Sequence, residues 1–344
     1  MRARAFVLAS VLIAALVALL VPASAFGQDS GVKLAIGDFG LGIGDVRRLD
    51  GLRLNFRDRD LELVRGINAT LWMPYEHPEG VVKGVALGLP LTGAAEIHGL
   101  ALGLGVGAER SLDGLGFAPI GLGVGEDLRG IAVAGVGLGA GGDMEGLMLG
   151  GVGAGAGRDF KGIAVGGVGL GAGRDLTGLA IGGVGLGAGG DLTGVAIGGV
   201  GLGAGGSVKG ITVGGVGVGA GGDIVGITVA GVGVGAGGEM KGLTLVGVGA
   251  GAPTITGVVV SGIAAGGRDV TGLVLAPAYF KIERGGTLHG VAASAFNNVR
   301  GSQRGLTIGL LNIADELHGL QVGVINIARN NDSFPVLPLF NYHR

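Results

Sequence analysis

An acidic side chain returns at one position of a short repeat, and this row of carboxylates is the part of the sequence that could do chemistry. The position lies three residues before a glycine, and Ser207 interrupts the row once. Ca²⁺ takes several oxygen ligands, many of them from carboxylates, so a stacked row of aspartates is a candidate calcium site. The candidate calcium ligands are Asp143, Asp159, Asp175, Asp191 and Asp223, and the same position holds Asp127, Glu239 and Asp269.

A turn is the second interpretation of this acidic position, and it is the favoured one. In an Asx-turn the Asp side chain accepts a hydrogen bond from its own local backbone. The period is also wrong for calcium-binding β-rolls, whose repeat is a nonapeptide. Basic residues next to the row, at Arg158, Arg174 and Arg268 before an Asp and at Lys209 nearby, are expected to relieve like-charge repulsion without a metal.

The elements that position this row come from a repeat of 16 residues. Anchor glycines recur at that spacing from Gly114 to Gly242, and residues 178–193 show the unit as GLAIGGVGLGAGGDLT. A fixed short period means that each unit packs against its neighbours in the same way, so the sequence predicts an array of β units. Glycine makes up 83 of 344 residues, which excludes helix as the repeating element because each glycine costs a helix about 1 kcal/mol.

Within a unit, apolar residues alternate as in a strand. Ile211 and Val213 share one face and Thr212 lies on the other; after the Gly214-Gly215 pair the alternation resumes one step out of phase. A slip at a Gly-Gly pair indicates a tight corner. We expect Ile and Val of the first stretch to meet Val, Leu and Ala of the second in a thin core, and Gly, Ala and Thr to face outward. The stacked threonines Thr212, Thr228 and Thr244 would then form an exposed row, either from ordinary β propensity or as a flat surface similar to ice-binding faces.

Two all-β architectures fit units of 14–16 residues. In a β-solenoid each unit is one coil, with the Gly-Gly pair at one corner and the acidic turn at the other. In an antiparallel outer-membrane β-barrel each unit is one spanning strand, since about 9–11 residues cross the bilayer. The solenoid is favoured because every turn looks alike and because the array lacks the aromatic girdles and long loops of such barrels.

The chain divides into four segments. Residues 1–25 are predicted to be a signal peptide, with Arg2 and Arg4 before an apolar run and a small-residue cleavage site at Ala23-Ser24-Ala25. Residues 26–83 form divergent N-terminal repeats, 84–272 the regular array, and 273–344 divergent C-terminal repeats with a cap. Atypical terminal units are typical of capped repeat arrays.

The outer segments resemble a family of bacterial surface-repeat proteins known from spirochaetes and other gram-negative groups. The resemblance lies in GLRLNF, in VRGINATLW, and in GLTIGLLNIADELHGLQVGVINIA followed by FPVLPLFNY. Units of that family look similar to G-L-Q-[IL]-G-L-[IV]-N-[IY]-A. The resemblance implies export and exposure at the cell envelope, and it implies no catalytic residues. The central array departs from the pattern because its asparagines are absent and its large residues are smaller.

Composition restricts the function further. The net charge of −2 gives no electrostatic case for nucleic acid, and the absence of cysteine excludes disulfides and thiol chemistry. Gly-x-Gly-x-x-Gly matches such as 137–142 arise from composition and join no strand to a helix. We therefore expect no catalytic residues and no cofactor. The sequence predicts a non-enzymatic repeat protein with a structural or surface-interaction role at the envelope, with an envelope surface, a glycan or a second copy as partner; the alternative is a channel or transport role as an integral barrel.

Overall fold

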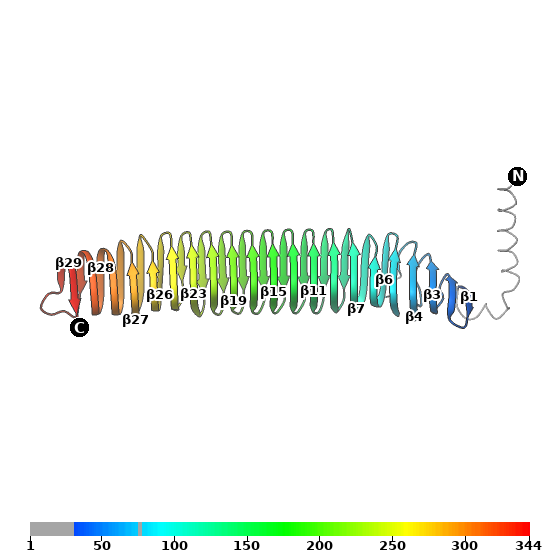
Figure 1. Ribbon diagram of the computed structural model, residues 1–344, viewed down its shortest axis with the longest axis horizontal. Coiled ribbons are helices and arrows are strands. Elements are labelled where there is room, and N and C mark those ends of the chain that lie inside the picture. Colours follow the sequence, from blue (N-terminus) through cyan, green and yellow to red (C-terminus); the bar gives the residue numbers. More distant parts are fainter. Residues whose placement is uncertain (1–30, 75–77) are drawn as a thin grey trace, which may run out of the picture. The chain divides into compact units, whose positions relative to one another are not determined.

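The computed structural model describes residues 31–74 and 78–344 (Figure 1). The chain forms two compact units, one ending at Gly135 and the other beginning at Val136. The predicted signal peptide lies outside the described residues. The unit boundary falls within the regular array expected over residues 84–272. No helix in the described ranges has the length and apolarity to cross a membrane.

In the second unit each 16-residue repeat forms one coil that contains a long strand and a short strand. In the coil used here as the reference, the long strand is β15 (Leu176–Gly182) and the short strand is β16 (Gly185–Ala188). The other strands of this unit are β10 (Gly137–Ala140), β11 (Met144–Gly150), β12 (Gly153–Ala156), β13 (Phe160–Gly166), β14 (Gly169–Ala172), β17 (Leu192–Gly198), β18 (Gly201–Ala204), β19 (Val208–Gly214), β20 (Gly217–Ala220), β21 (Ile224–Ala230), β22 (Gly233–Ala236), β23 (Glu239–Val246), β24 (Gly249–Gly251), β25 (Thr254–Ser261), β26 (Ala264–Leu275), β27 (Tyr279–Ala293), β28 (Phe296–Ala328) and β29 (Val336–His343).

Neighbouring coils pair in parallel and in register. Leu176 of β15 lies opposite Leu192 of β17, and Gly185 of β16 lies opposite Gly201 of β18. Each residue therefore stacks on its equivalent in the next coil, which is the arrangement of a β-solenoid. The solenoid prediction is confirmed, and the antiparallel barrel alternative is wrong because the coils of the array pair in parallel.

The first unit is built in the same way, from coils that are less regular. Its long strands also pair in parallel, with Gly51 opposite Gly66 and Gly66 opposite Gly84. Its strands are β1 (Val32–Ile36), β2 (Phe39–Ile43), β3 (Arg48–Asn55), β4 (Leu63–Thr70), β5 (Val81–Gly88), β6 (Leu91–Leu102), β7 (Gly105–Ala118), β8 (Gly121–Val124) and β9 (Asp127–Ala134).

The core lies between the two strands of each coil, and its long-strand side is filled by the opposite set of side chains from the one expected. Thr212 is 1% exposed, whereas Ile211 is 47% exposed and points outward with Val213. Thr228 and Thr244 are buried in the same row, so the expected outward threonine row is wrong, as is the expected inward placement of Ile and Val on the long strand. The short-strand half of the prediction is confirmed, because Leu186 and Val218 are buried.

In the coil of Thr212 the cause is the narrowing of the core toward the glycine corner. Val208 begins the long strand β19 and is fully buried, so alternation places Thr212 and Gly214 inward after it. A Cβ on Gly214 would collide with the carbonyl oxygen of Gly217 on the returning strand. In this coil the core therefore holds a larger residue at one end, a small one in the middle and no side chain at the corner, whereas the equivalent corner positions of the next two coils hold Ala230 and Val246.

The anchor glycines are required by the backbone. Gly178 has a φ of 127°, and a Cβ there would collide with the carbonyl oxygen of Gly162 in the preceding coil. Only glycine adopts such a conformation readily. This explains why the anchor position tolerates no other residue along the whole array.

Antiparallel strands end the ladder in each unit. In the first unit β1 pairs antiparallel with β2, and in the second unit β29 pairs antiparallel with the last part of β28. Pro338 lies within β29, where it removes a backbone donor. Proline in an edge strand discourages pairing with a further strand, so these terminal strands have the properties of caps, as expected for divergent ends.

The C-terminal coils contain a buried asparagine ladder. Asn297 Nδ2 donates to Asn312 Oδ1 at 2.8 Å, and Asn312 Nδ2 donates to Asn326 Oδ1 at 2.7 Å. All three side chains are fully buried. Stacked amides that satisfy one another inside a core fix the register of the coils that carry them.

Candidate functional site

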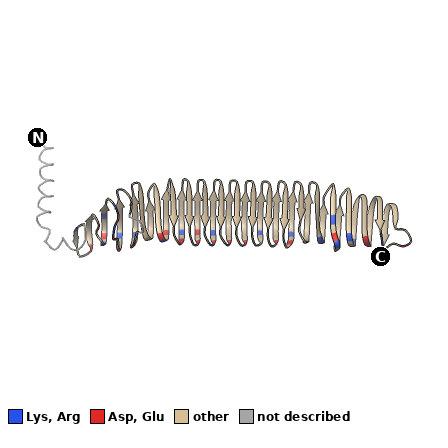
Figure 2. Ribbon diagram, turned by 180° about the vertical axis from the view of Figure 1, so that it is seen from behind, with Lys and Arg blue, Asp and Glu red and all other residues tan. Residues whose placement is uncertain are grey.

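The predicted acidic row lies at one corner of the second unit, where the ribbon of Figure 2 is red, for Asp and Glu, at the same edge of successive coils. Each carboxylate accepts a hydrogen bond from the backbone N–H of the equivalent residue one coil further on. Asp143 accepts from Asp159 N at 3.1 Å, Asp159 from Asp175 N at 3.1 Å, and Asp175 from Asp191 N at 2.8 Å. The row continues from Asp191 through Ser207 and Asp223 to the N–H of Glu239.

This geometry corrects the turn interpretation. An Asx-turn would use an N–H of the same turn, whereas the donor here belongs to the next coil, 16 residues away. The reason is the in-register stacking, which places the equivalent turn directly beside each side chain. The aspartates therefore connect neighbouring coils and continue the strand ladder through the turns.

Basic side chains neutralise part of the row, as the sequence predicted. Arg158 donates from Nε and Nη2 to Asp143 at 3.1 and 3.2 Å, and Arg174 donates to Asp159 at 3.1 and 2.8 Å. Lys209 Nζ donates to Asp191 Oδ2 at 2.9 Å. Three of these acidic positions thus carry both a backbone hydrogen bond and an ion pair.

These contacts lower the pKa of two aspartates in the row. The backbone N–H of Asp159 is the largest cause for Asp143, and the guanidinium of Arg158 adds to it. For Asp191 the pKa falls chiefly because of the N–H of Ser207 and then because of the hydrogen bond from Lys209. Hydrogen bonds to the charged form of a carboxyl always act in this direction.

The five candidate calcium ligands share a row but do not converge on one point. In Asp143, Asp159, Asp175, Asp191 and Asp223 one oxygen is already bound to the backbone of the next coil. Within residues 31–74 and 78–344 no group of three or more His, Asp or Glu side chains is placed to hold a metal ion. Calcium binding at this corner stays a prediction from the sequence.

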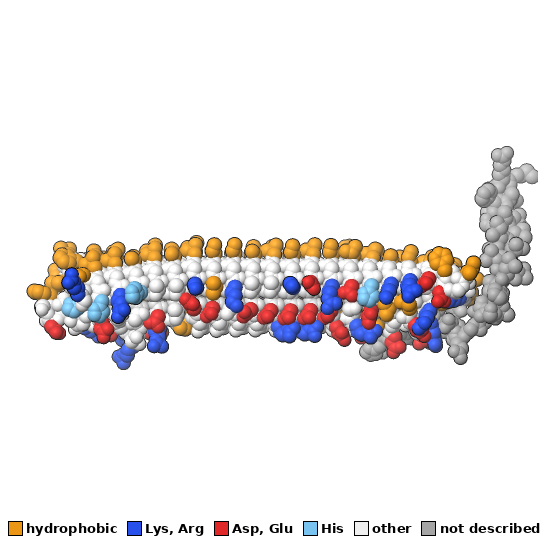
Figure 3. Space-filling model, turned by 60° about the horizontal axis from the view of Figure 1, so that its bottom comes forward, with side chains coloured by type: hydrophobic (Ala, Val, Ile, Leu, Met, Phe, Trp, Pro, Cys, Tyr) orange, Lys and Arg blue, Asp and Glu red, His pale blue; other side chains and the backbone are white. Residues whose placement is uncertain are grey.

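The outer surfaces of the two strands of a coil differ sharply. The long strand β15 turns Leu179 and Ile181 outward, whereas the short strand β16 turns only Gly185 and Gly187 outward. Figure 3 shows hydrophobic side chains along one side of the coils and charged side chains toward the opposite side. Sequence reasoning missed the outward aliphatic residues because it assigned the larger side chains to the core.

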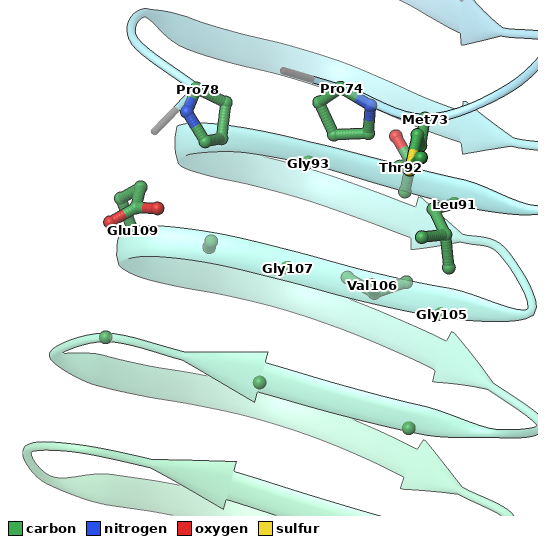
Figure 4. Close-up of a pocket in the computed structure, with 14 residues that line it drawn as sticks. Met73, Pro74, Pro78, Leu91, Thr92, Gly93, Gly105, Val106, Gly107 and Glu109 are labelled. Carbon is green, nitrogen blue, oxygen red and sulfur yellow. The ribbon is translucent and has the colours of Figure 1, made fainter. Parts of the chain in front are cut away.

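A groove of about 560 Å³ lies in the first unit, over its short strands (Figure 4). Met73, Pro74 and Pro78 form one wall, and glycines such as Gly105 and Gly107 form the floor. The volume lies within the range of small-molecule pockets. The described lining contains one carboxylate, Glu109, and no histidine, lysine or arginine, so it offers no acid–base pair and suits an apolar, extended group.

A buried ionic cluster in the first unit is the other feature that the sequence did not indicate. Arg53 is 0% exposed and donates from Nη1 to Asp58 at 2.7 Å and to Asn68 at 2.9 Å, while its Nε donates to the carbonyl of Val46 at 2.8 Å. Burial raises the pKa of Asp58, and Arg53 and Asn68 oppose that shift. The repeat alignment could have indicated this cluster. Arg53 lies opposite Asn68, and Asn68 lies opposite the buried Ala86, so all three occupy the inward position of the repeat.

The fold and these surfaces define a glycine-rich repeat protein of the β-solenoid class. Comparisons with protein-family models, with curated proteins and with solved structures find no match to this chain.

Proposed function

We propose that this protein is exported and acts as a non-enzymatic structural or surface-interaction element of the bacterial cell envelope. The observation that carries the proposal is the uniform outer surface of the coils, which repeats the same aliphatic and glycine positions from one coil to the next. A repeating surface of this kind is suited to contact with another extended surface and not to the conversion of a small substrate. The N-terminal segment 1–25 supports export, and the resemblance of the outer segments to surface-repeat proteins supports an envelope location.

Fractionation of a gram-negative host that expresses the full chain with its own N-terminus tests this proposal. We expect mass spectrometry to find a mature protein that begins at Phe26, and we expect it in the periplasmic, envelope or surface fraction. A variant with Leu12→Arg and Ala15→Arg, which interrupts the apolar run of the leader, is the control and is expected to stay in the cytoplasm uncleaved. An unprocessed wild-type protein in the cytoplasm would refute the proposal.

A further inference from the structure

The long strands of the second unit carry two outward rows of apolar side chains that run from coil to coil without interruption. We call these two rows the aliphatic face. Parallel pairing places the members of each row directly beside one another, from Leu147 opposite Ile163 to Val291 opposite Leu306. The first row is Leu147, Ile163, Leu179, Val195, Ile211, Ile227, Leu243, Val258, Leu273, Val291 and Leu306, and the second is Leu149, Val165, Ile181, Ile197, Val213, Val229, Leu245, Val260, Leu275, Ala293 and Ile308.

The two rows of the aliphatic face are apolar surface that the core of the coil does not cover. Ile163, Ile211 and Ile227 are 44%, 47% and 43% exposed, while the inward Ala164 between the two rows is fully buried. The large inward residue of each long strand, such as Phe160 or Leu176, lies at the other end of the strand. Monomeric proteins seldom expose a contiguous apolar patch larger than a few hundred Å², so a face of this composition indicates a surface that is covered in the assembled protein.

The size of the face is close to what a stable dimer requires. Two rows that each occupy about 6.6 Å along the strand, over eleven coils about 4.8 Å apart, give a face of roughly 700 Å². A stable protein–protein interface buries about 800 Å² on each partner. The aliphatic face therefore supplies most of that area, and the exposed valines of the adjoining glycine corner, such as Val168 and Val184, extend it.

We propose that the aliphatic face binds the aliphatic face of a second copy of this chain. The two rows repeat with the spacing of the coils, and the partner that shares this spacing over its whole length is an identical array. Side chains of one copy then fit between those of the other, as in the dry interfaces between paired β-sheets. A two-fold axis uses the same patch on both copies and closes the assembly as a dimer.

One margin of the face fits the rim of a protein interface. The neighbouring outward row, nearer the acidic corner, holds Lys161, Lys209 and Lys241, with Thr177, Thr193 and Val225 between them. Apolar centres with a polar rim are typical of such interfaces. The margin at the glycine corner is apolar, because valines there, such as Val168 and Val184, are 50% and 48% exposed. The two rows contain no Trp or Tyr, the residues enriched at contacts with a membrane surface. These features favour a second copy over a lipid surface.

The mass of the purified chain from residue 26 tests this inference, and it does so independently of where the protein resides in the cell. We expect sedimentation equilibrium at micromolar concentration to give twice the monomer mass for the wild type. The variant Ile163→Lys/Ile211→Lys/Ile227→Lys is expected to give the monomer mass with unchanged β-type circular dichroism. The matched control is Gly185→Lys/Gly201→Lys/Gly219→Lys, which adds the same charges on the short strands where no atom lies within 4 Å of a new Cβ, and it should keep the dimer mass.

Cross-linking keeps the inference testable if the triple lysine variant does not fold. Because the chain has no cysteine, Leu179→Cys places one thiol in the middle of the aliphatic face and Gly187→Cys places one on the short strand of the same coil. A short bismaleimide should join two copies of the first variant and not of the second. A monomeric wild type, a dimer that survives in the triple lysine variant, or cross-linking through Gly187→Cys alone would overturn the inference. A wild type that is monomeric and floats with phosphatidylglycerol vesicles would instead assign the face to lipid.

Discussion

Asp143 Oδ1 accepts a hydrogen bond from the backbone N–H of Asp159 at 3.1 Å, and the two residues are 16 positions apart in the chain. The same bond recurs along the corner, so one side chain per coil satisfies a donor of the next coil. The acidic row is therefore part of what holds the coils together. Its ion pairs with Arg158 and Arg174 are exposed and add little to stability by themselves.

Replacing Asp191 by alanine is expected to lower the stability of the second unit by about 1 kcal/mol, because the N–H of Ser207 loses its acceptor. Asp191→Asn is the matched control, since its amide oxygen still accepts that bond while the ion pair with Lys209 is lost. We expect the asparagine variant to lie closer to the wild type. Urea unfolding followed by circular dichroism measures the difference, and equal losses in both variants would assign the effect to charge.

The acidic row predicts a loss of stability in acid. The folded-state pKa values of Asp143 and Asp191 lie below the ordinary value of 3.8, so each group contributes stability that is present above that value and is lost as the pH falls through the folded pKa. We expect the thermal midpoint to fall between about pH 4 and pH 2 more steeply in the wild type than in Asp143→Asn/Asp191→Asn. Parallel curves for the two proteins would show that these carboxylates do not control the acid response.

Two glycines of one coil are expected to respond oppositely to alanine. Gly178 has a positive φ and no room for a Cβ, so Gly178→Ala should cost about 2 kcal/mol or more. Gly185 has a φ outside the positive region and open space around it, so Gly185→Ala should be neutral or stabilise by roughly 0.5–1 kcal/mol. Thermal unfolding of the two variants beside the wild type checks both signs, and similar destabilisation by both would contradict the described backbone.

Removing the centre of the asparagine ladder should be more damaging than removing an asparagine beside it. Asn312→Ala leaves the buried Oδ1 of Asn326 without its donor and takes one acceptor from Asn297 Nδ2, which predicts a loss of about 1–3 kcal/mol. Asn298→Ala removes a long contact of 3.4 Å to the Tyr279 hydroxyl and is the control. Hydrogen exchange of residues 296–328 should rise in the first variant, and equal protection in both would refute a role for the ladder.

The Arg53 cluster predicts an acid response of the opposite sign in the first unit. Because burial raises the pKa of Asp58, this group disfavours the folded state when charged, and its contribution to stability grows as the pH falls through the folded pKa. Asp58→Asn removes the titrating carboxyl group while keeping an oxygen that accepts a hydrogen bond from Arg53. We expect the protection factors of the amides in residues 46–70, which correct for the intrinsic pH dependence of exchange, to rise on mild acidification in the wild type and to change less in the variant.

The sequence by itself determined the period, the corners and the row of acidic residues. A spacing of 16 from Gly114 to Gly242 predicts identical units, and if those units are parallel coils they stack in register, which places Asp143 beside Asp159. The alternation around Thr212 likewise established that each long strand has two faces.

Only the tertiary structure decided which face is inside. Period-two alternation separates Ile211 and Val213 from Thr212 but does not say which set is buried, and the general preference for burying larger apolar residues indicated the wrong one. In the coil of Thr212 the deciding quantity is the width of the core between the two strands, which leaves no room for a Cβ at Gly214 beside the carbonyl oxygen of Gly217. That width depends on two strands meeting across the core, so no single stretch of sequence contains it.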